Sequence, residues 1–290
     1  MEGISIIVAT LAEHDLLPLL NSLEAQTCGK YECIVVDQSQ ERKAEQSVAN
    51  FRNIIYVHST KKGNSLNRNI GVSHSRFPIL AFPDDDCFYS EDVVERVLET
   101  FQLRPALAGI SGTWFDSISG RMVMGGKHGT LATRFNVWSS ITNLTIILRK
   151  EIFCSVNGYD HSFGLGSNVF EGGEETDLVL KILTAGGEIL YVPDIRVWHR
   201  QDKYVSINPR KQWGYEEAWG ALFRKWFARK KGLTIFITFI YFLFRSSCAA
   251  AIWALRGNLR NSKFYLMKNR ARLRGWTKYV NIKPNVCENQ

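Results

Sequence analysis

Three consecutive carboxylates, Asp84, Asp85 and Asp86, follow the apolar run FPILAF at residues 77–82. Adjacent carboxylates repel one another, so a bound cation would stabilise them. At the carboxyl end of a strand in an α/β sheet, where ligands bind, such oxygen ligands suit Mg²⁺ or Mn²⁺ carrying a phosphate. Because Asp is also common in turns, a solvated turn at the strand end is the alternative. The triplet by itself favours a metal site only slightly, and the rest of the chain adds to the case.

A second acidic group, Glu174, Glu175 and Asp177, follows Gly172 and Gly173. Acids in the first turn of a helix are favoured by its dipole, so helix capping alone could explain them. Two adjacent glutamates after flexible glycines could also deliver a general base to a substrate hydroxyl. The residues alone leave both interpretations open.

Three further polar positions lie where a ligand could reach them. Asp37 ends a predicted strand and could accept hydrogen bonds from a nucleotide base or ribose. The segment GNSLNRNIG at 63–71 places small residues and Arg68 at a helix start, suited to a diphosphate or to orienting the aspartates. Arg68 could equally form a purely structural ion pair with the acidic triplet. His199 follows a strand and could complete a metal shell, although a single His is usually structural.

These groups lie at the ends of predicted strands and helices. Short β-branched runs alternate four times with segments of helical spacing within about 85 residues, which is typical of a doubly wound parallel sheet. The predicted strands are 4–9, 33–36, 54–57 and 79–82, and the predicted helices are 16–23, 42–51 and 63–72. Further along we expect a helix at 92–101, shorter strands between 109 and 149, a helix at 175–185 and two short strands at 189–192 and 195–198.

Charge divides the chain into two parts. Residues 1–202 hold 18 Lys and Arg against 25 Asp and Glu, a balance of −7, whereas residues 203–290 hold 18 against 3, a balance of +15. The two balances sum to the net charge of +8. An acidic body with a basic tail indicates two different tasks.

Cysteine usage and the N-terminus indicate the compartment. The six cysteines are scattered without a C-x-x-C pair, which argues against a zinc site and for reduced thiols in the cytosol. The chain enters an apolar strand soon after Met1, without the charged and apolar regions of a secretory signal. We therefore expect the working part of the protein in the cytosol.

The tail combines apolar and basic residues. Residues 233–255 are as long as the roughly 20 apolar residues that a transmembrane helix needs, but Arg245 lies at their centre, where charge is expensive. Basic residues on both sides give no crossing direction. We prefer one or two helices lying on the cytosolic face of a membrane through residues 224–274, held by apolar burial and anionic lipid. The alternatives are a core helix with surface Lys and Arg, or a nucleic-acid-binding patch, for which no recognition motif is present.

Seven segments, in order, resemble family 2 glycosyltransferases of the GT-A fold, bacterial enzymes that build surface polysaccharides. The likeness runs from Ser5 to about Arg200 and comprises SIIVAT, IVVDQS, NSLNRNIGV, FPDDD, LRKEIFCSVNGYDHSFGLG, GGEETDL and VWH. It implies an α/β GT-A domain at 1–202 with a mostly parallel, Rossmann-like sheet. Within it, 1–108 would form the nucleotide-sugar donor half and 109–202 the acceptor half. The helical, basic tail at 203–290 would associate with the cytosolic face of the inner membrane.

The resemblance implies a metal-dependent enzyme that uses a UDP-, GDP- or dTDP-sugar and a glycan acceptor, which the tail suggests is lipid-linked. No nucleic acid is expected as a partner. Asp86 would be the main ligand of Mn²⁺ or Mg²⁺, with Asp84 and His199 beside it and Asp85 near the ribose and the metal. The base and ribose would be surrounded by Thr10, Glu13 and Asp37, and the diphosphate side would be supported by Arg68 and Asn69.

The resemblance further implies an inverting transfer with Glu175 as the catalytic base. The family usually has a Glu-Asp pair whose second residue is the base, and this chain departs from it with Glu174 followed by Glu175. Glutamate reaches further but has similar acidity. Glu174 or Asp177 could share the task or hold the acceptor.

Three competing functions remain open from the sequence. A nucleotidyl- or phosphoryltransferase could use a similar sheet and metal cluster, but leaves the second acidic group and the tail less explained. A non-catalytic membrane scaffold could keep the fold without the chemistry, and Glu175 in place of Asp mildly favours it. A nucleic-acid-binding protein would use the tail, but the acidic body argues against it.

Overall fold

The computed structural model describes residues 2–200, 208–229 and 232–281. The chain forms two compact units. Unit 1 comprises Met1–His161 and Glu174–Asp202, and unit 2 comprises Ser162–Gly173 and Lys203–Gln290. The division after residue 202 coincides with the change in charge. The short segment 162–173, however, belongs to unit 2 and not with the rest of the predicted domain 1–202.

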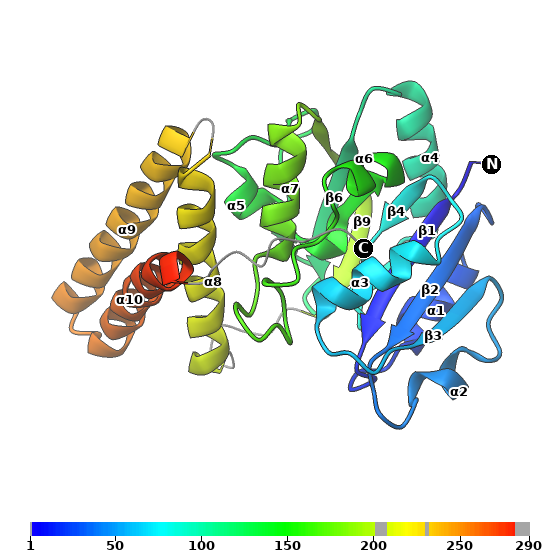
Figure 1. The fold of residues 1–290 in the computed structure, drawn as a ribbon, viewed down its shortest axis with the longest axis horizontal. Helices are drawn as coiled ribbons and strands as arrows, with labels where there is room; N and C mark the ends of the chain where they lie inside the picture. Colours follow the sequence, from blue (N-terminus) through cyan, green and yellow to red (C-terminus); the bar gives the residue numbers. More distant parts are fainter. Residues whose placement is uncertain (1, 201–207, 230–231, 282–290) are drawn as a thin grey trace. The chain divides into compact units, whose positions relative to one another are not determined.

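Among the described residues, unit 1 holds a nine-stranded sheet with the order β3-β2-β1-β4-β8-β6-β9-β5 and with β7 paired to β6 (Figure 1). Strands β3, β2, β1 and β4 are parallel to their neighbours in this group. Strands β1, β2 and β4 are almost entirely buried, as expected for parallel strands covered by helices. The alternating pattern predicted all four: β1 (Ile4–Thr10), β2 (Tyr31–Asp37), β3 (Ile54–His58) and β4 (Ile79–Ala81).

The other half of the sheet is mixed in direction. Strand β8 runs antiparallel to both β4 and β6, β9 runs parallel to β6, and β5 runs antiparallel to β9. The fold is therefore a mixed α/β sheet whose N-terminal half is parallel. The bounds are β5 (Phe88–Tyr89), β6 (Gly109–Asp116), β7 (Met122–Met124), β8 (Ile146–Arg149) and β9 (Ile189–His199).

Strand β9 is a single strand where the sequence predicted two. Its pairing with β6 shifts register between Ser111 and Thr113. A Cβ added to Gly112 would lie 2.3 Å from the carbonyl oxygen of Ile195. Because Gly112 has no side chain, β6 and β9 can approach closely where their register shifts. Strand β9 therefore continues beyond the shift as far as His199.

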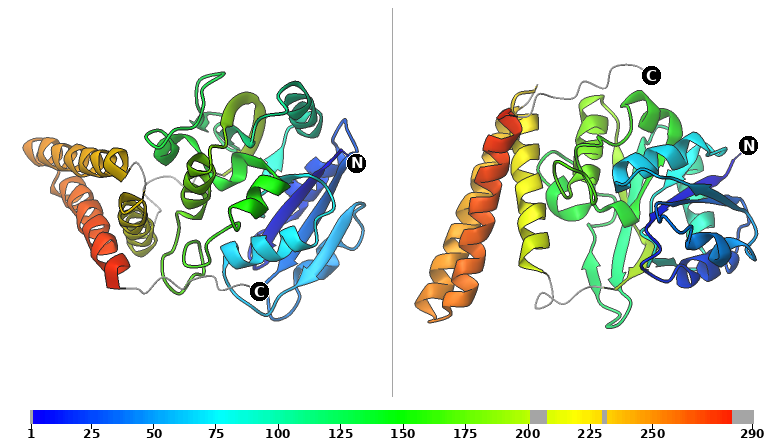
Figure 2. Two further views of the ribbon diagram at one scale, coloured as in Figure 1. Left: turned by 45° about the horizontal axis from the view of Figure 1, so that its top comes forward. Right: turned by 60° about the horizontal axis from the view of Figure 1, so that its bottom comes forward.

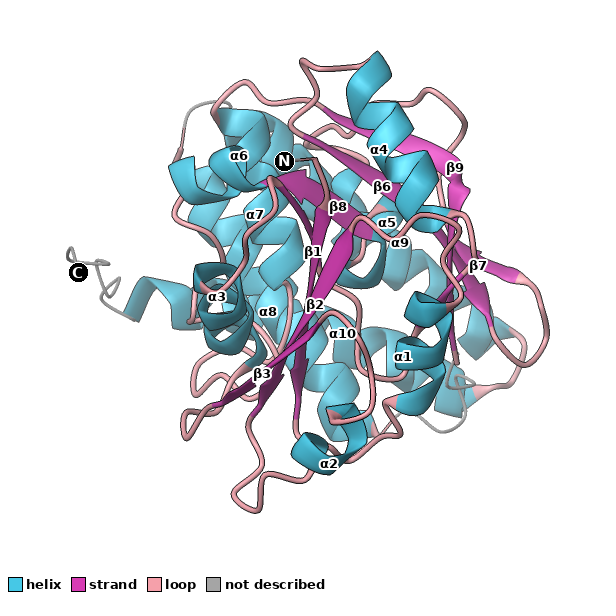
Figure 3. Cartoon of the chain, turned by 90° about the vertical axis from the view of Figure 1, so that its right-hand side faces the viewer, coloured by secondary structure: helices cyan, strands magenta, loops and turns pink. Residues whose placement is uncertain are grey.

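Helices cover both faces of the sheet (Figure 3). On one face Gly71 of α3 packs directly against Ile7 and Val36. On the other, Ile6 and Val8 join α1 and α4 in the main apolar core, because successive side chains of a strand point to opposite faces. The bounds are α1 (Leu17–Glu24), α2 (Ala44–Val48), α3 (Asn64–Ser73), α4 (Val93–Leu103), α5 (Val137–Ser140), α6 (Lys150–Ser155) and α7 (Glu174–Thr184), with a 3₁₀ turn at Asn143–Thr145.

Unit 2 contains three long helices, α8 (Pro209–Phe227), α9 (Gly232–Leu255) and α10 (Leu259–Asn281), shown in yellow, orange and red in Figure 2. Two glycines allow α8 and α10 to touch through their backbones. A Cβ on Gly220 would lie 1.9 Å from the Arg272 carbonyl oxygen, and one on Gly275 would lie 1.8 Å from that of Glu217. This close crossing requires glycine at both positions.

The segment 162–173 packs against α8 and α10 within unit 2. The rings of Phe163 and Phe170 stack with centroids 5.1 Å apart. Lys278 on α10 donates a hydrogen bond of 2.8 Å to the Val169 carbonyl. Gly172 and Gly173, with φ of +150° and +81°, end the segment immediately before α7. These conformations favour glycine and direct the chain into the helix that begins at Glu174.

Helix α9 exposes a broad apolar face. It is 24 residues long with a mean hydropathy of 1.8 over its most apolar stretch, of which 28% is buried. A core helix would be mostly buried, so this low fraction disfavours the core-helix alternative. Arg245 is exposed, and the twelve residues that separate it from Leu233 place it about 120° around the helix, at the border of the apolar face. Exposed apolar side chains on α9 include Leu233, Ile237, Ile240, Phe244 and Leu255.

Helix α10 also exposes apolar side chains, together with basic ones. Its exposed large apolar side chains recur every seven residues, and so do the exposed Lys263 and Arg270. Because seven residues are close to two helical turns, each set forms a stripe along the helix. The apolar stripe is Leu259, Leu266, Leu273 and Val280.

Candidate active site

The loop Asp84–Asp86, hereafter the aspartate loop, lies where parallel strands end. Strands β1, β2 and β4 run in one direction, so their carboxyl ends meet at one edge of the sheet. Thr10 ends β1, and its hydroxyl donates a hydrogen bond of 2.5 Å to Asp85 Oδ2. Burial raises the pKa of Asp85 above its usual range, although this hydrogen bond opposes the change. The structure therefore brings together two predicted site residues from separate motifs.

Arg68 on α3 joins the two acidic groups. Its Nη2 lies 2.8 Å from Asp84 Oδ1, and its Nη1 lies 3.0 Å from Glu174 Oε1. The side chain is only 2% exposed. Burial alone would lower the pKa of Arg68, but the Asp84 and Glu174 carboxylates raise it above its usual value. The guanidinium is therefore a permanent buried cation between the groups.

Asn143 and Tyr159, which the sequence reasoning did not select, complete this network. The Asn143 amide donates a hydrogen bond of 2.8 Å to Glu174 Oε1 and a longer one of 3.5 Å to Glu175 Oε2. The Tyr159 hydroxyl donates a hydrogen bond of 2.9 Å to Asn143 Oδ1 and fixes the amide. Tyr159 lies within the NGYD segment of the resemblance, whereas nothing in the sequence singled out Asn143.

Glu175, the predicted base, begins helix α7 beside Glu174. Its burial, and secondarily the negative charge of Glu174, raise the pKa of Glu175 to about 8. A carboxylate with a pKa near the working pH can both accept and return a proton, as general-base catalysis requires. Because Glu174 is held by Arg68 and Asn143, Glu175 is the less engaged carboxylate of the pair.

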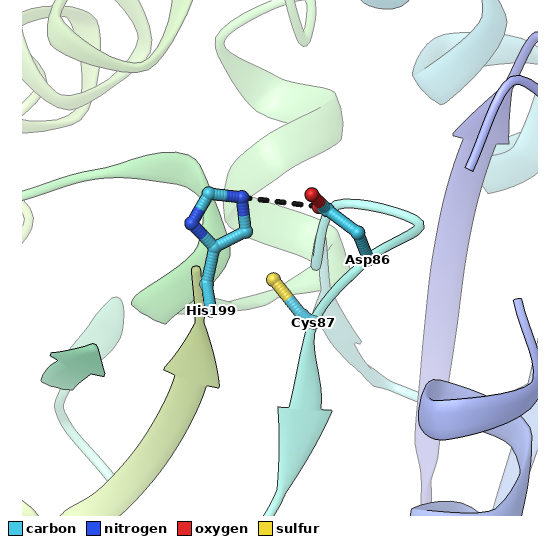
Figure 4. A group of neighbouring side chains, drawn as sticks. All are labelled: Asp86, Cys87 and His199. Atoms are coloured by element: carbon cyan, nitrogen blue, oxygen red, sulfur yellow. Dashed lines mark ion pairs between the residues drawn. The ribbon is translucent and has the colours of Figure 1, made fainter. Parts of the chain in front are cut away.

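A candidate ligand set for a cation lies at the end of the aspartate loop (Figure 4). Asp86 Oδ1 lies 3.0 Å from His199 Nε2. The Cys87 sulfur joins them, and the three ligand atoms lie within 4.8 Å of one another. Burial would raise the pKa of Asp86, but the hydrogen bond and charge of His199 hold it below its usual value. Cys87 was not predicted as a ligand, and the predicted ligand Asp84 is paired with Arg68.

Asp37 is a fully buried carboxylate at the end of β2. It accepts hydrogen bonds from Ser39 N at 2.7 Å, Ala44 N at 3.0 Å and the Tyr56 hydroxyl at 3.1 Å. Burial would raise the pKa of Asp37, but these hydrogen bonds hold it below its usual value. The contacts give Asp37 a structural role in shaping the loop before α2. That helix is shorter than predicted, because Arg42 has a φ of +55° and cannot be helical.

The structure gives Asn69 a different environment from the predicted diphosphate side. Its amide donates to the Tyr159 carbonyl at 2.9 Å, lies 2.8 Å from His161 Nε2, and accepts from the Tyr159 N–H at 3.0 Å. It thus ties α3 to the chain at 159–161. This role stabilises the neighbourhood of Arg68 and does not place the Asn69 amide on the aspartate loop.

Asp177 also differs from its prediction as a partner in catalysis. It is completely buried, and its Oδ2 lies 3.5 Å from Nζ of Lys181, one turn further along α7. Two residues correspond to about 200° around a helix, so Asp177 faces away from Glu175. Glu13, by contrast, is exposed on the loop after β1.

Comparisons with known proteins support the fold of this chain. The sequence profile described as Glycosyl transferase family 2 matches residues 5–153. The succinoglycan biosynthesis protein ExoM of Rhizobium meliloti strain 1021 is 31% identical over an alignment 207 residues long, and the alignment covers 66% of this chain and 64% of ExoM. The chain therefore matches somewhat less than two thirds of the length of ExoM.

Two further proteins match most of the chain. Glycosyltransferase AglE of Haloferax volcanii is 23% identical over 280 residues, 92% of this chain and 84% of AglE. The crystal structure of S. aureus TarS 1-349 covers 93% of this chain and 91% of its own, with a TM-score of 0.58 and 12% identity. At this identity the structural likeness shows the fold alone.

Proposed function

Because the chain belongs to glycosyl transferase family 2, we propose that it transfers a sugar from a nucleotide-sugar donor to a glycan hydroxyl, with inversion at the anomeric carbon. The donor is a UDP-, GDP- or dTDP-sugar, and the cofactor is Mn²⁺ or Mg²⁺. The observation that carries the proposal is the pair of acidic groups joined by buried Arg68. One group serves the leaving diphosphate, and the other serves the attacking hydroxyl.

The aspartate loop fits a divalent cation. Asp86 and His199 offer an oxygen and a nitrogen 3.0 Å apart, and Asp84, which precedes Asp86 on the same loop, keeps 37% of its side chain exposed. Asp86 and His199, with Asp84, would hold the ion. When bound, the ion supplies positive charge for the departing nucleotide diphosphate. Thr10 and Glu13, at and after the end of β1, are the proposed surroundings of the nucleotide base and ribose, and Asp37 shapes the neighbouring loop after β2.

Glu175 is the proposed base. It removes the proton from the acceptor hydroxyl as the oxygen bonds to the anomeric carbon and the bond to the diphosphate breaks. Arg68 and Asn143 hold Glu174 in place beside it. In this arrangement burial, and secondarily the charge of Glu174, keep the pKa of Glu175 high, and Glu175 acts once it has lost its proton.

The proposed acceptor is a lipid-linked glycan at the cytosolic face of the inner membrane. The relative ExoM is named for succinoglycan biosynthesis, which supports a polysaccharide product. The apolar faces of α9 and α10 carry exposed leucines beside exposed basic residues, and residues 218–287 contain no Asp or Glu. This combination suits a surface of anionic lipid.

A panel of nucleotide sugars tests the proposal on the purified full chain. We expect one nucleotide sugar with Mn²⁺ or Mg²⁺ to raise the melting temperature and to be turned over with a glycan acceptor. Asp86→Ala is expected to lose the cation-dependent part of the shift while remaining folded. If no nucleotide sugar in the panel binds with either ion, the proposal is wrong.

A further inference from the structure

The three side chains at the end of the aspartate loop offer three different ligand atoms. Asp86 presents oxygen, His199 nitrogen and Cys87 sulfur, and all lie within 4.8 Å of one another. In Figure 4 the Cys87 sulfur points toward the space between the other two side chains. Asp86 and His199 are partly exposed, whereas Cys87 is fully buried. A cation entering from solvent would thus have the thiol on its inner side.

The sulfur and nitrogen in this ligand set are not the ligands that magnesium prefers. Mg²⁺ prefers oxygen ligands at octahedral positions, whereas thiolate and imidazole favour Zn²⁺ and similar ions. Protein zinc sites commonly use combinations of Cys, His and carboxylate, with Zn–S distances of about 2.3 Å and Zn–N distances of about 2.0 Å. Ligand atoms within 4.8 Å of one another can reach such distances through small side-chain movements.

We propose that Cys87 is a third ligand in the cation site, which therefore binds thiophilic divalent ions such as Zn²⁺ and Cd²⁺ in competition with Mn²⁺ and Mg²⁺. This inference rests on the proposed function in placing the catalytic cation at Asp86 and His199. It adds a means of inhibition, because a tightly held thiophilic ion occupies the position needed by the working ion. The three ligands do not form a short sequence motif. Asp86 and Cys87 lie on the loop before β5, and His199 ends β9.

Binding of the ion releases a proton from the Cys87 thiol. The S–H bond of Cys87 breaks, a sulfur–metal bond forms, and the proton passes to the buffer. His199 binds the ion through the lone pair of Nε2, so the proton that Nε2 donates to Asp86 also leaves: it moves to Nδ1 of a neutral ring, or passes to the buffer from an imidazolium. The hydrogen bond between His199 and Asp86 is then replaced by two bonds to the ion. No oxidant or reductant takes part.

Ultraviolet titration of the full chain with Cd²⁺ tests the inference, because a thiolate bound to Cd²⁺ gives a charge-transfer absorption. We expect the wild type to show this band and Cys87→Ser to lose it, with Cd²⁺ affinity falling by roughly 10- to 100-fold or more. The matched control is Cys154→Ser, at an exposed cysteine on α6, which should keep the band. A band that survives in Cys87→Ser would overturn the inference.

Competition on the unaltered protein gives a second test that does not depend on whether Cys87→Ser folds. We expect excess Mn²⁺ to remove the Cd²⁺–thiolate band of the wild type, because both ions share Asp86 and His199. A band that resists displacement by bound Mn²⁺ would place the thiolate elsewhere and overturn the inference. If Mn²⁺ does not bind the wild type at all, while the band depends on Cys87, the thiol ligand stands and the Mn²⁺ part of the proposed function fails.

Discussion

Each unit of the molecule contains a buried arginine bound to glutamate, but the surrounding charges differ. In unit 1, Arg68 is the cation between Asp84 and Glu174, with Glu175 next to it. In unit 2, Arg272 binds Glu216 through two contacts of 2.6 Å. Three further cations lie on the same helix and neutralise the two glutamates of α8: Lys268, Arg274 and Lys278.

The pKa values show the consequence of this difference. The carboxylates around Arg68 raise its pKa despite its burial, and Glu175 is left with a pKa of about 8. Burial lowers the pKa of Arg272, and Glu216 only partly offsets it. In unit 1 the carboxylates around Arg68 outnumber the cations beside them, so they can hold a further cation and a proton. In unit 2 the cations of α10 neutralise both glutamates of α8. The same kind of ion pair thus joins two acidic groups in one unit and two packed helices in the other.

The largest expected effect is on transfer, from Glu175→Gln. The amide cannot accept the hydroxyl proton, so we expect the transfer rate to fall by roughly 10²- to 10⁴-fold with donor affinity unchanged. Rates and donor binding are measured on the same preparation. The matched control is Glu188→Gln, at an exposed position beyond the other end of α7, which should keep full activity. Loss of donor binding in Glu175→Gln would instead move Glu175 to the donor site.

Removing the buried cation of unit 1 should destabilise the fold. Arg68→Met leaves Asp84 and Glu174 without their shared partner, and we expect the free energy of unfolding to fall by about 3–5 kcal/mol. Urea denaturation measures this loss. Arg42→Met is the control, because Arg42 pairs with Glu45 at the surface and should change stability by less than about 1 kcal/mol. Equal effects of the two substitutions would contradict the bridging role of Arg68.

The corresponding substitution in unit 2, Arg272→Met, should have a smaller effect. Lys268 still lies 3.0 Å from Glu216 and can neutralise it, so we expect a loss of about 2–3 kcal/mol, largely from hydrogen bonds. Affinity for Mn²⁺ and nucleotide sugar should remain, whereas Arg68→Met loses it. A loss of donor affinity in Arg272→Met at a temperature where the protein is folded would show that the two arginines do not have separate tasks.

Membrane binding should depend on the apolar stripe of α10. Leu266→Ser with Leu273→Ser removes two half-exposed leucines, each worth about 1.5–3 kcal/mol when fully buried. We expect at least roughly tenfold weaker binding to vesicles containing anionic lipid. The control is Leu103→Ser, a 79% exposed leucine on α4 of unit 1. This pair is more informative than deletion of residues 224–290, because α8 and α10 also pack against the segment 162–173.

The smallest expected effect is on the pH dependence of stability. With its pKa raised, folded Glu175 holds a proton that the unfolded chain has already released between the ordinary value of a glutamate and about pH 8. The folded state binds more protons in this window, so stability falls as pH rises through it. Urea titrations of wild type and Glu175→Gln should diverge above the ordinary glutamate pKa, with the variant losing less stability. Parallel curves would contradict the raised pKa.

The sequence predicted the parallel half of the sheet well, because buried β-branched runs and helical spacing are local signals. It also placed the aspartate loop at a strand end. It did not predict that Arg68 would reach Glu174, since the two are 106 positions apart and only the fold brings them together. Asn143 was missed for the same reason. Cys87 was not predicted as a ligand because it belongs to no C-x-x-C pair, and His199, which lies beside it in the structure, is far away in sequence.

The position of Asp177 on α7 relative to Glu175 follows from the sequence itself. Helical geometry places it on the other side of α7 from Glu175, and the structure confirms that it is buried against Lys181. The single strand β9 is a different case. Gly112, which lets Ile195 approach β6, lies far away in sequence, so the continuity of β9 could not be predicted from residues 189–198.

The most direct measurement is the anomalous diffraction of manganese in crystals grown with Mn²⁺ and a nucleotide sugar. The account predicts a manganese peak within bonding distance of Asp86 and the donor diphosphate, with Glu175 on the opposite side of the sugar. Crystals saturated with both compounds that show no manganese at the aspartate loop would contradict it.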